Sequence, residues 1–372
     1  MSASGASLSA SPSGDEQVPA PPVVFRTGST VHLDEWVAPD ICDELGFLRP
    51  GKILEWMDVV GVLAAGRHCA RPVVTASVDG MELSRPIRVG ERVSMTASVA
   101  FTSHRSIGVC IQVTSGMKPE ARQTVNAYVT FVAVDDDGRP LPVPVFVPQT
   151  PQEQARFLEG KLRHELRKKL TAGPHEDVRR WLENEVPREE RPLAIREALK
   201  LLPRVKLPWA SDVPRRPDQS YIHKIEPVRG GTLNFHGTLY GGTLMRWLET
   251  AAQLSARSYL DGAAVELSSL HGLTFMRPVR PHVFVHVRAA VVHTHEETLT
   301  ALVNTETEDP VAGTRDETLR AFLTFAPRPN LAGRRRPPPP LQCIGEDEKA
   351  LYNEVAARLE LHRVVARQRA AG

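Results

Sequence analysis

An internal duplication constrains the fold of this chain more than any other feature of its sequence. Residues 51–68 align with residues 242–259, and Trp56 matches Trp247, 191 positions later. In both copies apolar residues recur at i, i+3, i+4, i+7 and i+10, which is one face of an amphipathic helix. Each copy is therefore predicted to contain one long helix.

The match continues beyond the helix. The dipeptide Arg85-Pro86 corresponds to Arg277-Pro278, 192 positions later, and segments of alternating apolar residues follow in both copies. Each copy then closes with an apolar-aromatic segment, 128–134 in the first and 321–327 in the second. We therefore expect an α+β unit of one helix followed by four or more antiparallel strands, present twice.

The two units are expected to pack together. One helix cannot cover both faces of a twisted sheet, so the apolar helix face should lie on the concave side. Pairing between edge strands of the two units would give one continuous sheet and would remove two exposed edges. The expected segments are an N-terminal tail (1–27), a first domain (28–148), a helical and Pro-rich connector (149–216), a second domain (217–328) and a Pro/Arg-rich C-terminal tail with a helix (329–372).

Composition narrows the class of protein. The net charge of +2 argues neither for nor against a nucleic-acid or membrane partner, and no run of about 18 apolar residues suggests a membrane span. The first 22 residues lack the basic and apolar regions of a signal peptide. The four cysteines lie far apart without a CxxC motif, which favours reduced thiols. We expect a cytoplasmic protein without a nucleic-acid partner.

The copies differ at two polar places, and the first lies before the helix. The second copy has Asn234 and the pair Gly241-Gly242, where the first copy has Asp43 and Pro50-Gly51. Paired glycines at a helix start let a ligand approach the backbone, and the free amides there suit a phosphate or a carbonyl oxygen gaining negative charge. The pair is equally compatible with a simple turn.

The second difference lies in the strand after the helix. Asp79 of the first copy aligns with His271 of the second. An acid among small and apolar residues is costly to bury, so it either bonds to nearby backbone amides or has a chemical task. A site formed by Asn234 and Asp79 would be complete, whereas the opposite combination of Asp43 and His271 would be altered.

At these residues the sequence resembles the tandem hotdog-fold acyl-CoA thioesterases. The resemblance is carried by the pattern N-x-x-G-x-x-x-G-G before the second helix, by VTASVD (74–79) and by FTSHRS (101–106), and it covers roughly 28–148 and 217–328. It implies two hotdog domains back to back with an active site between them. Carried over by motif, the catalytic Asn and Asp are Asn234 and Asp79, which implies one working site per chain.

Both helices also carry an acid seven residues after the opening glycine, Asp58 in the first and Glu249 in the second. Some other hotdog thioesterases use a helix carboxylate, so Glu249 is a second candidate for the base or for orienting water. Asp79 is the first candidate because the copies differ there, whereas both copies keep a helix acid.

The implied reaction is hydrolysis of a fatty acyl-CoA to a fatty acid and CoA, with Asp79 as general base on a water or, as the alternative, as the attacking nucleophile. Asn234 would orient that water or the thioester. Backbone amides at Gly241, Gly242 and Thr243 would polarise the thioester carbonyl. The candidates for binding CoA are Arg67, His104, Arg105 and Ser106. Neither a cofactor nor a metal is expected, since His293 and His295 have no evident third ligand.

Two other functions stay open from the sequence. The same fold serves enoyl-thioester hydratases and dehydratases, which need an Asp/His pair near the helix, and His236 and His271 are candidates for it. A non-catalytic acyl-CoA-binding scaffold is the other possibility. Paired hotdogs usually assemble further, so the resemblance also implies a homo-oligomer, with a trimer of double hotdogs as the expected form.

Overall fold

The computed structural model describes residues 30–116, 121–135, 137–171, 214–329, 335 and 337–370. The expected N-terminal tail (1–27) and residues 172–213 of the expected connector lie outside the described residues.

Each copy forms a helix wrapped by a five-stranded sheet. The first, called hotdog 1, contains β1 (Val31–Trp36), η1 (Pro39–Ile41), α1 (Pro50–Cys69), β2 (Val73–Leu83), β3 (Arg92–Thr102), β4 (Ser106–Ser115) and β5 (Arg122–Ala133). The second, called hotdog 2, contains η2 (Pro217–Ser220), β6 (Ile222–Pro227), η3 (Gly230–Thr232), α5 (Gly241–Tyr259), β7 (Val265–Phe275), β8 (Phe284–His295), β9 (Thr298–Asp309) and β10 (Thr314–Pro327).

The two hotdogs share one antiparallel sheet of ten strands, in the order β1-β3-β4-β5-β2-β7-β10-β9-β8-β6. The copies join where β2 pairs with β7, with Val78 opposite Leu273, which confirms the expected continuous sheet. The short strands β1 and β6 precede the helices and were not expected from the sequence. They form the two outer edges of the sheet.

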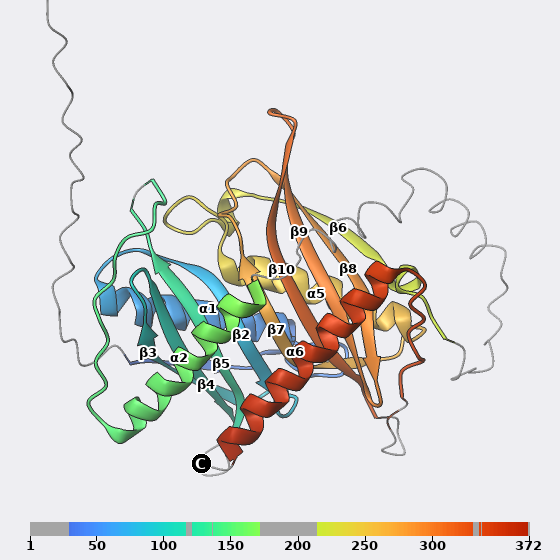
Figure 1. Cartoon of the computed structure of the whole chain (residues 1–372), viewed down its shortest axis with the longest axis horizontal. Coiled ribbons are helices and arrows are strands. Elements are labelled where there is room, and N and C mark those ends of the chain that lie inside the picture. Colours follow the sequence, from blue (N-terminus) through green and yellow to red (C-terminus); the bar gives the residue numbers. More distant parts are fainter. Residues whose placement is uncertain are drawn as a thin grey trace, which may run out of the picture.

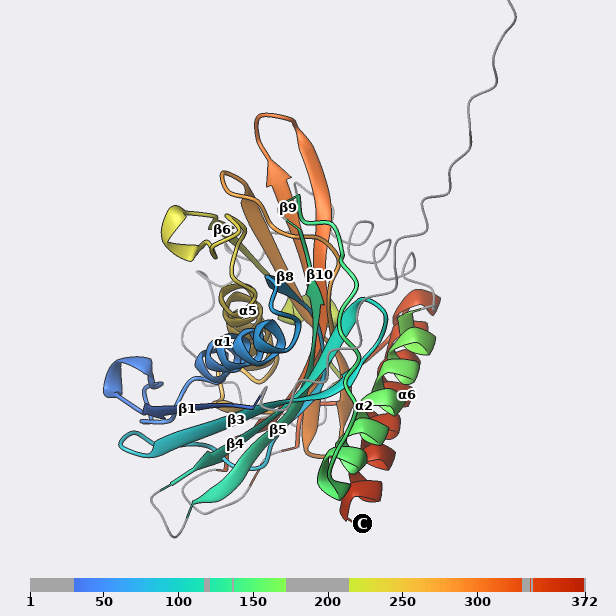
Figure 2. The same cartoon turned by 90° about the vertical axis from the view of Figure 1, so that its left-hand side faces the viewer.

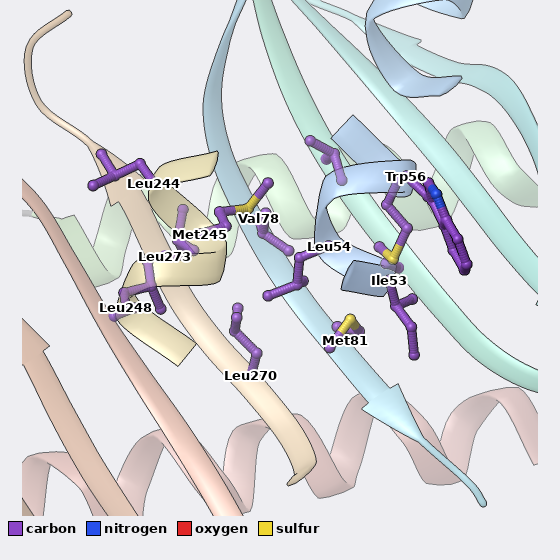
Figure 3. Packing of buried hydrophobic residues seen from close by; sticks show 14 of the residues in the cluster. Ile53, Leu54, Trp56, Val78, Met81, Leu244, Met245, Leu248, Leu270 and Leu273 are labelled. Atoms are coloured by element: carbon purple, nitrogen blue, oxygen red, sulfur yellow. The ribbon is translucent and has the colours of Figure 1, made fainter. Parts of the chain in front are cut away.

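Helices α1 and α5 lie side by side on the concave face of this sheet, as expected (Figure 2). Their apolar side chains meet those of β2 and β7 at the centre of the molecule, where Leu54 and Leu248 face Met81 and Leu270 (Figure 3). All four side chains are fully buried. Truncating one such side chain to alanine typically costs about 2–5 kcal/mol, so this shared core fixes the two copies to each other.

The start of each helix touches the other helix. A Cβ atom placed on Gly242 would lie 2.8 Å from Cα of Glu55, and one on Gly51 would lie 3.2 Å from Cα of Arg246. Glu55 and Arg246 themselves form an ion pair across the two helices. Glycine at these positions is therefore required by the close approach of the helix backbones.

Two further helices, α2 (Pro151–Thr171) and α6 (Glu346–Ala370), lie on the opposite, convex face (Figures 1 and 2). Helix α2 packs Phe157 against Phe101 of β3, with ring centroids 5.5 Å apart. Helix α6 buries Leu351 and Val355 against hotdog 2. Among the described residues, no helix has the length and apolar character needed to cross a membrane.

Candidate active site

An acid in the middle of α1 is held against the start of α5. Asp58 is 2% exposed. Its Oδ2 accepts the backbone amide of Gly242 at 2.8 Å, and its Oδ1 accepts the hydroxyl of Thr75 on β2 at 2.5 Å. The carboxylate of one hotdog thus caps the positive end of the helix of the other.

Burial raises the pKa of the Asp58 carboxyl above its ordinary value, while the hydrogen bonds from Thr75 and Gly242 act in the opposite direction. A carboxylate whose pKa is raised is a stronger base in its ionised form, and the two hydrogen-bond donors favour that form. Asp58 therefore has the environment of a general base.

Asn234 lies in a tight turn before α5. Its side-chain oxygen accepts the amides of His236 at 2.9 Å and Thr238 at 3.1 Å, and its side-chain nitrogen donates to the Thr238 hydroxyl at 3.0 Å. Gly237 adopts a φ of +70° in this turn, a conformation that favours glycine. The turn therefore holds Asn234 in one orientation.

A cavity of about 590 Å³ brings these groups together, within the size range of small-molecule sites. Its wall includes Asp58 and Thr75 from hotdog 1 and Asn234 and Gly241 from hotdog 2. We call these four residues the complete site. The apolar part of the wall includes Val62, Val73, Val74, Val132, Val134, Leu239, Leu244, Phe275 and Val279.

The glycines at the start of α5 have different roles. A Cβ atom on Gly241 would lie 3.1 Å from the Thr75 hydroxyl and 3.2 Å from Asp58, so glycine keeps the polar end of the cavity open. The amide of Gly242 donates to Asp58 and is not free for a thioester carbonyl, which corrects that expectation. Thr243 is not part of the cavity wall. Gly241 is the expected backbone donor that fits.

The structure does not bring Asp79 and Asn234 together. Val78 and Met81 of β2 point into the core between sheet and helices, and Asp79 points to the convex face, where it pairs with Arg167 of α2 at 2.5 Å. The matching His271 is bonded to Ser269 on β7 at 2.7 Å. Neither residue is part of the cavity wall, because the alternation of the strand directs both away from the helices.

The four residues expected to bind CoA are also absent from the cavity wall, namely Arg67, His104, Arg105 and Ser106. The Ser106 hydroxyl bonds to Ser103 at 2.6 Å within the β3–β4 turn, and the His104 carbonyl accepts the amide of Val143. Arg67 lies in the last turn of α1, nine residues or roughly 13 Å along the helix from Asp58. These four residues therefore lie outside this cavity wall, and their role in binding CoA stays a prediction.

The repeat creates a second, related arrangement, which we call the reciprocal site and define by Asp43, Gly51, Glu249 and Leu267. Glu249 is 3% exposed and accepts the amide of Gly51, as Asp58 accepts that of Gly242. The pairing of β2 with β5 skips Ala76, and the pairing of β7 with β10 skips Ser268, so Thr75 corresponds to Leu267.

Because leucine has no hydroxyl, Oε1 of Glu249 has no hydrogen-bond partner among the described residues. Burial raises the pKa of Glu249 to about 7. Glu249 therefore belongs to the reciprocal site and not to the cavity wall around Asn234, which corrects its place as a candidate base there.

Asp43 forms the same turn as Asn234, accepting the amides of Leu45 and Phe47, each at 2.9 Å. Its other oxygen is paired with Arg328 at 2.6 Å, and Arg328 packs over the ring of Phe47. His271 was the expected partner of Asp43. In the structure Asp43 is paired with Arg328, and the acid of the reciprocal site is Glu249. The reciprocal site thus has no counterpart of the Asn234 side-chain amide or of the Thr75 hydroxyl.

Thr75 is the site residue that the sequence comparison did not single out. A signal was present, since VTASVD contains a threonine whose counterpart in the second copy is Leu267. Asp58 was a candidate from the sequence, but both copies carry an acid at this helix position. The sequence therefore did not reveal that the neighbours of Asp58 and Glu249 differ. The part of the chain that the structure describes contains no group of three or more His, Cys, Asp or Glu side chains able to hold a metal ion.

Comparisons with known proteins find similar sequences and similar folds. A model of the thioesterase superfamily matches twice, at residues 45–120 and 236–313. The cytosolic acyl coenzyme A thioester hydrolase of Rattus norvegicus is 35% identical over 146 residues, 38% of this chain and 38% of that protein. Acyl-coenzyme A thioesterase 11 of Mus musculus is 25% identical over 364 residues, 95% of this chain. The chain spans only 56% of that mouse protein.

A solved structure from Lactobacillus plantarum, described as a putative oleoyl thioesterase, covers 81% of this chain and is itself covered to 97%. The TM-score is 0.50 at 11% sequence identity, so this likeness supports the fold alone.

Proposed function

The chain belongs to the thioesterase superfamily, and from that premise we propose that it hydrolyses acyl-CoA thioesters to a carboxylic acid and CoA. The observation that carries the proposal is the placement of Asp58 between the Thr75 hydroxyl and the Gly242 amide, in the wall of a cavity that also contains Asn234. In this proposal the base comes from one hotdog and the asparagine from the other, and Asp58 takes the role that the sequence analysis gave to Asp79.

In the proposed reaction, Asp58 removes a proton from a water molecule, and the water oxygen attacks the thioester carbonyl carbon. The amide of Gly241, at the positive end of α5, stabilises the negative charge that develops on the carbonyl oxygen. The C–S bond then breaks, and the proton held by Asp58 is transferred to the departing thiolate of CoA. Asn234 positions the water or the thioester, because its turn holds it rigidly at the cavity.

The Thr75 hydroxyl stabilises the ionised form of Asp58 and orients its second oxygen. The apolar wall, which includes Val62 of α1 and Leu244 of α5, accommodates the acyl chain. Burying each methylene of the chain contributes about 0.8 kcal/mol, so the length preference depends on how far this apolar wall extends.

The hydrolase is favoured over an enoyl-thioester hydratase. Of the two histidines expected for a hydratase, His236 lies in the cavity wall and His271 lies outside it. The relatives are named as thioester hydrolases or thioesterases. No cofactor is needed for the proposed steps, since every group in them is supplied by the chain or by water.

A thiol-release assay with acyl-CoA substrates from acetyl to palmitoyl tests this function. The unmodified protein is expected to release free CoA, and Asp58→Asn to lower kcat by about 100- to 10,000-fold, the usual contribution of a general base. Glu249→Gln, at the matching acid of the other helix, is the control and should keep kcat within a factor of two. Binding of acyl-CoA without thiol release at any chain length would instead identify a non-catalytic binding protein.

We also propose that the double hotdog assembles further, as a trimer of chains in the cytoplasm. Leu158 and Leu162 lie one turn apart on α2 and are 57% and 39% exposed, so they offer an apolar strip to a second copy. The name of the rat relative describes it as cytosolic, which supports the compartment. Light scattering of the purified protein tests the mass, and a mass of one chain would contradict the assembly.

A further inference from the structure

Asp79 and Arg167 form an ion pair on the convex face, behind the strand that carries Thr75. Their side chains are 10% and 20% exposed. Nη1 of Arg167 donates to Oδ1 of Asp79 at 2.5 Å, and it also lies within hydrogen-bond distance of the Ser77 hydroxyl, at 2.9 Å, and the Thr130 hydroxyl, at 2.6 Å. Hydrogen bonds between charged groups are stronger than those between neutral ones. We call Ser77, Asp79, Thr130 and Arg167 the convex clamp.

The convex clamp lies at an irregular stretch of β2. The pairing of β2 with β5 skips Ala76, and Ser77 opposite Thr130 is the first pair after it. Side chains two positions apart in a regular strand point to the same face of the sheet. Because of the bulge at Ala76, Thr75 instead bonds to Asp58 on the concave side, while the Ser77 hydroxyl belongs to the clamp on the convex side. The bulge therefore determines whether Thr75 can reach Asp58.

A bulge needs support from outside the sheet, because it interrupts the ladder of backbone hydrogen bonds. A shift of the pairing by one residue would turn the side chains of β2 to the opposite face. The pairing with β5 skips a second residue, Asp79, so Ser77 and Val78 are paired between two irregularities. Arg167 contacts both strands at this place, through Ser77 on β2 and Thr130 on β5. The convex clamp therefore fixes the pairing that follows the first bulge.

The second copy differs on both faces of the corresponding strand. On the convex face, His271 stands at the position of Asp79 and bonds to Ser269 at 2.7 Å. On the concave face of the same strand, Leu267 stands at the position of Thr75. The convex carboxylate therefore occurs in the copy whose strand carries the threonine of the complete site, and both are replaced together in the other copy.

Helix α2, which carries Arg167, has other anchors on the convex face of the sheet (Figure 2). Phe157 packs against Phe101 of β3, with ring centroids 5.5 Å apart. Arg163 lies over the ring of Tyr128 on β5, 4.6 Å from its centroid. These contacts hold α2 to β3 and β5 without β2, so the contacts of Arg167 can be removed while the helix stays in place.

From these observations we propose that Arg167 is a positioning residue for the hydrolytic site. By binding Asp79 and Ser77 from the convex side, it holds β2 in the bulged pairing that presents the Thr75 hydroxyl to Asp58. The inference rests on the proposed function, since Thr75 and Asp58 belong to that site. It gives Asp79 a role in hydrolysis through the strand rather than through contact with the substrate.

The first test is steady-state hydrolysis of acyl-CoA by Arg167→Gln. We expect kcat to fall about 10-fold, because the hydrogen bond from Thr75 to Asp58 is formed less often. KM should stay within a factor of two, because Arg167 lies outside the cavity wall. The Thr75 hydrogen bond lowers the pKa of Asp58, so the acid limb of the pH–rate profile should move to higher pH. Arg167→Lys, which keeps a cation beside Asp79, should recover most of the loss. An unchanged kcat in Arg167→Gln would overturn the positioning role.

A double-mutant cycle separates positioning from a general loosening of the protein. In a Thr75→Val background there is no hydroxyl to position, so adding Arg167→Gln should change kcat less than about two-fold. The same loss in both backgrounds would overturn the proposal, because Arg167 would then act by a route that does not include Thr75. Arg163→Gln is the matched control, since Arg163 lies one turn earlier on α2 and contacts Glu159 and Tyr128 instead of β2; kcat should stay within a factor of two.

Hydrogen–deuterium exchange tests the convex clamp without any activity. In Arg167→Gln the amides of β2 should exchange about 10-fold faster than in the unmodified protein, while those of β8, four strands away, should not change. Asp79→Asn weakens the same ion pair from the other side and provides the same comparison if Arg167→Gln does not fold. If the unmodified protein hydrolyses no thioester, the proposed function fails, but faster exchange confined to β2 still supports the clamp. Equal exchange of β2 in the variant and the unmodified protein overturns it.

Discussion

The carboxylate of Asp58 in α1 accepts the backbone amide of Gly242, the second residue of α5, at 2.8 Å. This contact joins the helices of the two copies where the start of α5 packs closely against α1. Asp58 therefore caps α5 and also lines the cavity. Both roles depend on the packing of one copy's helix against the other's.

Thr75 is expected to be a positioning residue for Asp58. Thr75→Val removes the hydroxyl that donates to Oδ1 at 2.5 Å, and we expect kcat to fall about 10- to 100-fold, the equivalent of about 1.4–2.8 kcal/mol. The same hydrogen bond lowers the pKa of Asp58, so the acid limb of the pH–rate profile should also move to higher pH. Thr75→Ser should restore both. An unshifted limb would show that the hydroxyl only packs.

Asn234 and Asp43 form the same turn. Exchanging their side chains therefore changes the charge at each site while the turn is kept, which separates an effect on catalysis from an effect on folding. Asn234→Asp keeps the acceptor for the amides of His236 and Thr238 but adds a negative charge near Asp58. We expect a loss of kcat/KM of about 100-fold or more with little change in melting temperature. The control Asp43→Asn, at the reciprocal site, should keep kcat/KM within a factor of two. Similar losses from both exchanges would indicate two working sites.

The acid limb of hydrolysis should report Asp58. Because burial raises the pKa of this carboxyl above 3.8, and only the ionised form acts as a base, kcat/KM should rise with pH over a range above pH 3.8 and then level off. Asp58→Asn should remove this limb from any residual activity. A pH–rate profile with its acid limb unchanged in Asp58→Asn would assign the base to another group.

Glu249 should make the fold less stable as the pH rises. Its pKa is raised from 4.5 to about 7, so between these values the folded state holds a proton that the unfolded state releases. The contribution of this protonated carboxyl to the free energy of unfolding is fully present below pH 4.5 and is lost as the pH rises through 7. The loss is on the order of 3 kcal/mol. Denaturant unfolding at pH 5 and pH 8 measures it.

The glutamine side chain of the Glu249→Gln variant cannot ionise, so the variant's free energy of unfolding should depend less on pH than that of the unmodified protein. Compared with the unmodified protein, the variant should therefore be more favoured at pH 8 than at pH 5. Parallel stability curves of the two proteins between pH 5 and pH 8 would contradict a buried, neutral Glu249.

Much of the fold was predictable because it depends on local periodicity. The helical spacing around Trp56 and Trp247 and the alternation of the later strands identified both units, and the need to cover a sheet face placed the helices on the concave side. The short edge strands β1 and β6 were missed, since six residues outside the aligned region carry too weak a pattern.

The site was predicted in part. Asn234 and Gly241 do line the cavity, because their turn and helix start are local features with a clear sequence pattern. Asp79 does not, because the strand parity near the bulge at Ala76 turns it toward α2, where Arg167 pairs with it. A difference between the copies at that position therefore reflected packing on the convex face and not the chemistry of the cavity.

The sequence alone determined that the chain contains two related units, what elements each contains and that one half of the pair carries a complete asparagine turn. The tertiary structure alone decided which acid meets that turn. The reason is physical: α1 and α5 approach closely enough for Asp58 to reach the Gly242 amide, and such a contact between residues 184 positions apart depends on how the two helices pack against one sheet.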